Sequence, residues 1–121
     1  MTRKDLSPSD VPMDDIYALL NRLGATANYV GFFYLAYAIR LAVEDPGRLR
    51  LVTKCLYPDV AKYYGTKWTC VERNIRTIIA VMWDSNPTLL AEVVGFPVSV
   101  RPRCARMVAI LTAYCTRNWK G

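Results

Sequence analysis

The chain has no histidine. Imidazole is the one side chain that ordinarily titrates near neutral pH, so its absence excludes Ser-His-Asp and Cys-His catalysis and imidazole-ligated metals. The four cysteines are 15, 34 and 11 positions apart and form no CxxC pair, which argues against a zinc knuckle or a redox motif. We therefore expect no enzyme activity, no cofactor, no metal site, and free thiols at Cys55, Cys70, Cys104 and Cys115.

Long apolar runs are also missing. The first eight residues contain no apolar segment typical of a signal peptide. The longest uncharged stretch, residues 23–39, has 17 residues and includes Gly24, Thr26, Asn28 and Gly31. A membrane span needs about 20 predominantly apolar residues, so this stretch is expected to be a buried helix. The sequence predicts a cytoplasmic protein without a membrane partner.

Acidic residues are scarce in the second half of the chain. Residues 1–60 hold seven basic and seven acidic side chains, whereas residues 61–121 hold nine basic and three acidic ones, which accounts for the whole net charge of +6. This asymmetry favours a polyanionic partner, either nucleic acid or an anionic membrane surface. A basic protein with no such partner gives the same count, so charge alone leaves the alternatives open.

The chain has 121 residues, of which 53% are hydrophobic, enough for one compact domain. Residues 1–12 mix charge and proline without periodicity and are expected to form a flexible leader, followed by a helical domain over residues 13–121. Apolar spacing, acidic starts and Gly or Pro stops predict six or seven helices and no convincing strand, an all-α fold without a winged helix. The expected helices cover about residues 14–23, 28–44, 48–55, 58–64, 66–83, 87–94 and 104–116, with an extended loop at 95–102.

The second expected helix is mostly apolar and should supply the centre of the core. The residues expected at that centre are Phe32, Phe33, Leu35, Ile39 and Val43, and Tyr29, Tyr34 and Tyr37 are also predicted to be core rather than ligand-binding.

A helix-turn-helix is predicted between residues 57 and 76. Ala61 is followed four positions later by Gly65 and six further on by Val71. A small residue lets the two helices approach, glycine permits the left-handed turn, and valine packs the second helix on the first. Thr66 is expected to be the N-cap of that second helix.

The second helix has two unlike faces when wound at 100° per residue. One carries Val71, Ile75, Ile78 and Met82; the other carries Thr69, Glu72, Arg73 and Arg76 on an arc about 100° wide. Arginine can bind guanine O6 and N7 together, and glutamate can accept from cytosine N4. Glu72 and Arg76 are also a favourable i,i+4 pair, so a plain solvated face remains the alternative.

The same residues resemble a known family. The segments LYPDVAK at 56–62, VERNIR at 71–76, AVMW at 80–83 and GFFYL at 31–35 are similar to the C-terminal effector domain of the sporulation initiation response regulator (stage zero, factor A) of endospore-forming bacteria. The similarity covers about residues 14–114. It implies an all-helical, nucleoid-associated transcription regulator that binds double-stranded DNA in the major groove and pairs with a second copy on tandem sites.

By position, the resemblance implies that Glu72 and Arg73 contact bases and that Arg76 is a basic neighbour on the same face. Cys70 stands where the family has a DNA-reaching arginine and Trp68 where it has a small residue, so the family's target sequence does not carry over by itself. Only about 13 residues precede the first expected helix, so we expect no receiver domain and no control by aspartyl phosphorylation.

Further candidates surround this helix. We expect Thr66, Lys67, Trp68 and Thr69 to lie at the recognition helix, and Arg101 and Arg103 to form a phosphate-binding loop. Lys62 and Arg106 are either phosphate contacts or solvated charges, Trp68 either stacks on DNA or closes the turn, and Cys70 is either an oxidant sensor or a passive thiol. The rival to DNA binding is a helical interaction module that pairs with a related regulator without reading DNA.

Overall fold

The computed structural model describes residues 13–95 and 100–118, so the expected leader and residues 96–99 of the expected loop lie outside the described residues. The described residues form helices and no strand, which confirms the all-α prediction. The elements in chain order are α1 (Met13–Arg22), α2 (Val30–Glu44), the 3₁₀ helix η2 (Pro46–Arg50), α3 (Val52–Cys55), α4 (Tyr57–Tyr64), α5 (Trp68–Ser85), α6 (Pro87–Val94) and α7 (Cys104–Asn118).

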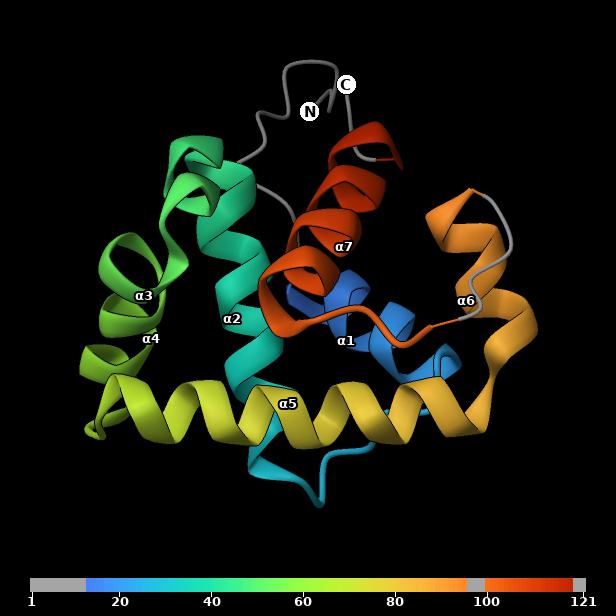
Figure 1. Ribbon diagram of the computed structural model, residues 1–121, viewed down its shortest axis with the longest axis horizontal. Coiled ribbons are helices and arrows are strands. Elements are labelled where there is room, and N and C mark those ends of the chain that lie inside the picture. Colours follow the sequence, from blue (N-terminus) through green and yellow to red (C-terminus); the bar gives the residue numbers. More distant parts are fainter. Residues whose placement is uncertain (1–12, 96–99, 119–121) are drawn as a thin grey trace, which may run out of the picture.

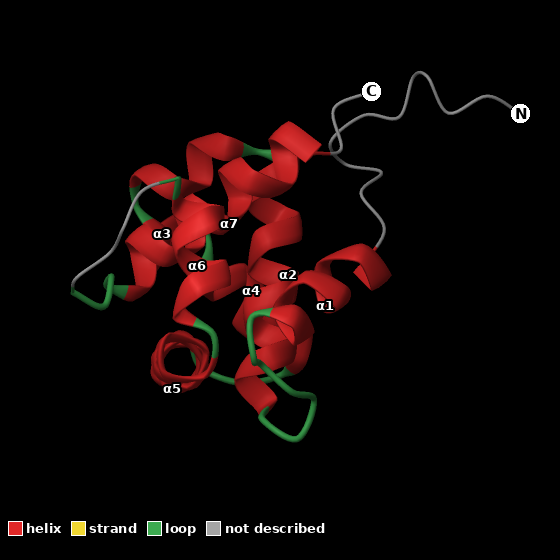
Figure 2. Cartoon of the chain, turned by 90° about the vertical axis from the view of Figure 1, so that its right-hand side faces the viewer, coloured by secondary structure: helices red, strands yellow, loops and turns green. Residues whose placement is uncertain are grey.

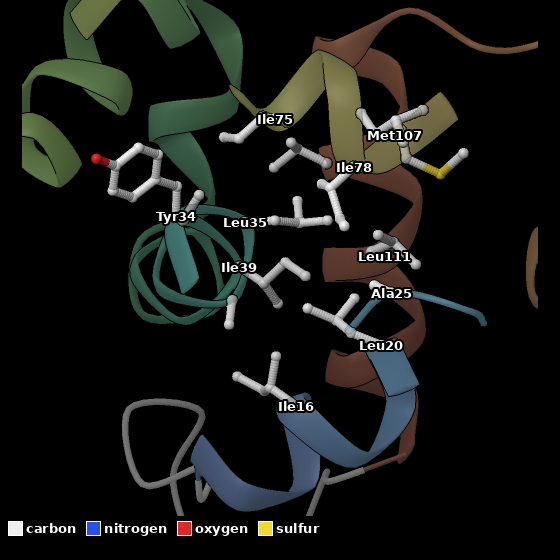
Figure 3. Close-up of a cluster of buried hydrophobic side chains, with 14 of the residues drawn as sticks. Ile16, Leu20, Ala25, Tyr34, Leu35, Ile39, Ile75, Ile78, Met107 and Leu111 are labelled. Carbon is white, nitrogen blue, oxygen red and sulfur yellow. The ribbon is translucent and has the colours of Figure 1, made fainter. Parts of the chain in front are cut away.

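Helix α2 runs through the middle of the molecule, with α5 across one end of it and α7 alongside (Figure 1). It is apolar around most of its circumference, and such a helix is stable in water only when other elements cover it on several sides. Figure 3 shows Leu35 and Ile39 of α2 meeting Ile78 of α5, Leu20 of α1 and Leu111 of α7. One continuous core therefore joins α1, α2, α5 and α7.

The expected centre of this core is largely confirmed. Phe32, Leu35, Ile39 and Val43 are buried, whereas Phe33 is only half-buried. The prediction that Tyr29 is a core residue is wrong, because α2 begins one residue later and leaves Tyr29 in the loop with 37% of its surface exposed. Tyr34 is buried and Tyr37 half-buried.

The helix expected at residues 48–55 is two elements rather than one. Pro46 and the Asp45 carboxylate, which accepts from Gly47 N at 3.1 Å, start the 3₁₀ helix η2. Leu51 then leaves helical geometry at φ −152° before α3 begins. The break arises because the tight Asp45-Pro46-Gly47 turn fixes the first residues in the narrower helix.

Two of the predicted helix ends have different outcomes. The helix expected over residues 87–94 is confirmed as α6: Asn86 is its N-cap and accepts from Leu89 N at 3.2 Å, with Pro87 in the first turn. Thr66 is not the N-cap of α5; Lys67 is, and no side chain caps it. The Thr66 N–H instead bonds Ala61 O at 2.9 Å and closes α4 beyond the left-handed Gly65, so Thr66 belongs to the end of the preceding helix.

Candidate nucleic-acid interface

Helices α4 and α5 form the expected helix-turn-helix. Ala61 and Val71 are buried where the two helices pack, and Gly65 between them has φ +70°. A residue with a Cβ is strained at this φ, so the glycine has a conformational reason to be there. The three-residue spacing pattern therefore predicted the geometry correctly.

Helix α5 has one buried stripe and one open face. Val71, Ile75, Ile78 and Met82 have no exposed surface. On the opposite side Thr69, Arg73 and Arg76 are exposed, while Glu72 is half-buried. Figure 2 looks down α5 and shows the helix at a corner of the molecule, with the other helices on one side of it only. The described helices that pack on α5 thus leave its other side uncovered.

Glu72 lies at one edge of this face rather than at its centre. Its carboxylate is 3.7 Å from Arg76 Nη2, and its side chain is 32% exposed. The Cys104 thiol lies 3.9 Å from the Glu72 carbonyl oxygen, which ties the start of α7 to α5. Arg73, by contrast, is exposed, and its guanidinium forms no ion pair within the described residues.

A pocket of about 500 Å³ opens along the Glu72 edge. It brings Arg76 of α5 together with Arg101 and Arg103 of the segment before α7, and α3 forms its other wall through Val52 and Thr53. Arg101 and Arg103, which the sequence predicted to bind phosphate, therefore share one hollow with part of α5. Sequence reasoning missed Thr53, because no local pattern indicates that α3 faces α5.

The other edge of α5 is tightly packed. A Cβ built on Gly31 would lie 2.1 Å from Asn74 O, so α2 begins almost in contact with the α5 backbone. The Asn74 amide turns along its own helix and donates to Cys70 O at 2.8 Å and to Cys70 Sγ at 3.4 Å. No room for a ligand remains between these two backbones.

The loop between α1 and α2 passes this edge of α5 and projects into solvent (Figure 1). Thr26, Asn28 and Tyr29 are exposed there, and the Thr26 hydroxyl donates to the Asn28 side-chain oxygen. The sequence predicted that Asn28 and Tyr29 start a core helix, so these polar groups beside α5 were also missed. The only local signal was Gly31, because the chain comes into close contact with the α5 backbone at this glycine, just after the loop.

The pKa values of the cysteine thiols at the two edges are shifted in opposite directions. A hydrogen bond from the Thr66 hydroxyl, with the nearby Arg73 charge, holds the pKa of Cys70 below its ordinary value. Burial raises the pKa of Cys104 at the start of α7. All four cysteines are free thiols, as expected.

The remaining predicted residues lie around the start of α5. Lys67, Trp68 and Thr69 are exposed, and Trp68 has 40% of its surface in solvent, so it does not fill the core. Thr66 is half-buried; Lys62 and Arg106 are exposed. Within residues 13–95 and 100–118 no three metal-ligating side chains gather, and no helix is long and apolar enough to cross a membrane.

An all-helical domain that offers the arginine-bearing second helix of a helix-turn-helix to solvent has the architecture of a DNA-binding effector domain. The comparison with protein families agrees: the family described as "Sporulation initiation factor Spo0A C terminal" matches residues 16–114. The chain belongs to this family, whose members are DNA-binding regulator domains rather than enzymes. The match runs from the first buried residue of α1 to Tyr114 in α7 and so includes the whole interface described above.

Proposed function

We propose that this protein is a sequence-specific transcription regulator that inserts α5 into the major groove of double-stranded DNA. The observation that supports this most directly is the exposed Arg73 on the outward face of α5, in the second turn of that helix and opposite a fully buried stripe. In such motifs the first turns of the second helix contact base edges.

In this proposal Arg73 and Glu72 each contact a different base. Arg73 is exposed at the centre of the face and binds guanine O6 and N7 with two hydrogen bonds. Glu72 accepts from cytosine N4 at the edge of the face, where its carboxylate lies 3.7 Å from Arg76 Nη2. Both contacts need side chains near the surface: Arg73 is exposed, and the Glu72 side chain is 32% exposed.

Phosphates are held on both sides of the groove. Lys67, Trp68 and Thr69 lie at the start of α5, where the first N–H groups of the helix also favour an anion. Arg76, Arg101 and Arg103 act on the side of the pocket. Thr66 supports this region through its backbone bond to α4 and its hydroxyl contact with Cys70, rather than as a cap.

The bound form is a pair of copies on tandem sites. This part of the proposal rests on membership of the family and on the length of α5, because one α5 reads only one groove segment. In the bacterial cell such a pair acts on the nucleoid.

A selection from random duplexes, followed by fluorescence anisotropy on the enriched site and on random DNA, tests the proposal. We expect one preferred sequence, and a slope of log K against log salt of about −4 to −5 if about five phosphates are neutralised. A stoichiometry of two chains on a tandem duplex checks the pairing. If no sequence is enriched at low salt, the rival role, an interaction module that binds a related regulator, replaces this one.

A further inference from the structure

We propose that the pocket between α3, α5 and the start of α7 binds a small phosphate monoester, and that this ligand competes with DNA. The pocket itself is observed independently of any role in DNA binding, whereas the competition rests on the proposed function. Residue patterns along the chain indicated no small-molecule site, because the pocket walls come from three separate segments.

The charge of the walls favours a dianion. Three arginines, Arg76, Arg101 and Arg103, and one acidic residue, Glu72, line the pocket, for a net charge of +2. The carboxylate is already paired with Arg76 at 3.7 Å, which reduces its repulsion toward an anion. Planar guanidinium groups match the geometry of phosphoryl oxygens, and a terminal phosphate monoester carries close to two negative charges at neutral pH.

The start of α7 adds neutral donors. The first helical bond at this end joins Met107 N to Arg103 O at 2.9 Å, so the N–H groups of Cys104 and Ala105 precede the helical ladder. Both residues line the pocket, and α7 is 15 residues long. Its dipole therefore contributes positive potential at the place where the arginines gather.

A buried hydroxyl behind the wall gives independent support. Tyr57 is fully buried, and its hydroxyl has no hydrogen-bond partner among the described residues. The charged and polar groups that act on it are Cys104, Glu72 and Arg76, all of which line the pocket. Burial raises the pKa of Tyr57, so the hydroxyl stays a proton donor. A buried donor without an acceptor is costly. Because Tyr57 does not itself line the pocket, a bound anion relieves this cost only by drawing a wall residue or a water into contact with the hydroxyl.

The size of the pocket favours a free phosphate ester over a backbone phosphate of DNA. A backbone phosphate of DNA is a single diester with one charge, which needs only a surface contact. A volume of about 500 Å³ lies within the range of sites that enclose a small ligand. The pocket therefore has space for a phosphate together with the group that it esterifies.

Isothermal titration of the full chain with adenosine 5′-monophosphate, without DNA, tests this inference, with adenosine as the uncharged probe. We expect the monophosphate to bind with a Kd at or below about 1 mM and adenosine not to bind. Arg101→Gln and Tyr57→Phe should each weaken monophosphate binding by about tenfold. Arg117→Gln, at the far end of α7, removes the same charge away from the pocket and should change nothing. Circular dichroism melting confirms that each variant is folded.

The outcomes separate the two proposals. Monophosphate binding without any DNA binding would support the pocket and overturn the proposed function. DNA binding that Arg101→Gln weakens, with no monophosphate binding, would assign the pocket to a backbone phosphate and overturn the inference. Equal losses for Arg101→Gln and Arg117→Gln would show binding to net charge alone and would also overturn it. If both proposals hold, the monophosphate displaces labelled DNA in anisotropy at constant ionic strength, and Tyr57→Phe reduces that displacement.

Discussion

The two edges of α5 are built in opposite ways. At the edge near Asn74, the backbone of α2 comes so close through Gly31 that not even a Cβ fits. At the edge near Glu72, arginines from two segments surround an open pocket of about 500 Å³. The first edge fixes the position of the helix through backbone contact, and the second leaves its charged side chains free to meet a ligand. The contacts that hold α5 in place and the charged side chains that remain accessible thus lie on different sides of one helix.

Substitution at the packed edge should have the largest effect. Gly31→Ala places a methyl group 2.1 Å from Asn74 O, so α2 and α5 must move apart. We expect a loss of about 3 kcal/mol in the free energy of unfolding, measured by urea denaturation. Gly47→Ala is the matched control, since its Cβ meets only the exposed Asp45 carboxylate at 3.1 Å and should cost less than about 1 kcal/mol. Similar losses for both would mean that the Gly31 approach is not a rigid contact.

The face between the edges should determine sequence preference. Arg73→Ala removes the exposed central guanidinium and should weaken binding to the selected site by about 1 to 3 kcal/mol, with relaxed preference at one base pair. Lys67→Ala, at the start of the helix, should weaken all sequences alike and make the salt slope shallower by about 1. Anisotropy on selected and random duplexes compares the two variants. Equal losses on both duplexes for Arg73→Ala contradict its reading role.

The reaction rates of the thiols at the two edges provide a chemical test of the difference between those edges. Because the thiolate is the reactive form, the lowered pKa of Cys70 should make it react faster with iodoacetamide at pH 7 than Cys104, whose pKa burial raises. We expect a rate ratio of about ten, measured by mass spectrometry of the native protein. Cys115 provides the inert reference, since it is buried and its pKa is raised to about 12. Faster reaction at Cys104 would show that the pocket edge is looser than described.

The ion pair at the open edge should matter least for stability. Glu72→Gln removes one partner of a partly exposed i,i+4 pair, so the free energy of unfolding should fall by only about 0.2 to 0.5 kcal/mol. Urea denaturation in low and high salt measures this difference, which should shrink as salt rises. A loss above about 1 kcal/mol would mean that the pair is part of the fold rather than of the interface.

Local sequence rules predicted the helices where one segment carries the whole signal. Gly65 ended α4, Asn86 and Pro87 began α6, and the stripe from Val71 to Met82 was fully buried. The rules failed where two neighbouring elements compete for one residue. Thr66 has a side chain suited to an N-cap, but its backbone N–H belongs to the last turn of α4. Similarly, the Asp45-Pro46 turn makes the start of an expected α-helix a 3₁₀ segment.

The candidate site shows the same division. The outward position of Arg73 followed from helical periodicity, because the angle between residues on one helix depends only on their spacing. That Arg101 and Arg103 join Arg76 in one hollow, with Tyr57 behind it, did not follow, since these residues are far apart along the chain.

The amino-acid sequence by itself determined the helical class, the helix-turn-helix and the two faces of α5, because backbone propensity, turn glycines and 3.6-residue periodicity act within a few residues of each other. Only the tertiary structure decided which edge of α5 is packed and which is open. That difference depends on how α2, α3 and α7 approach the helix, and their approach is set by the fit of the whole core rather than by any local segment.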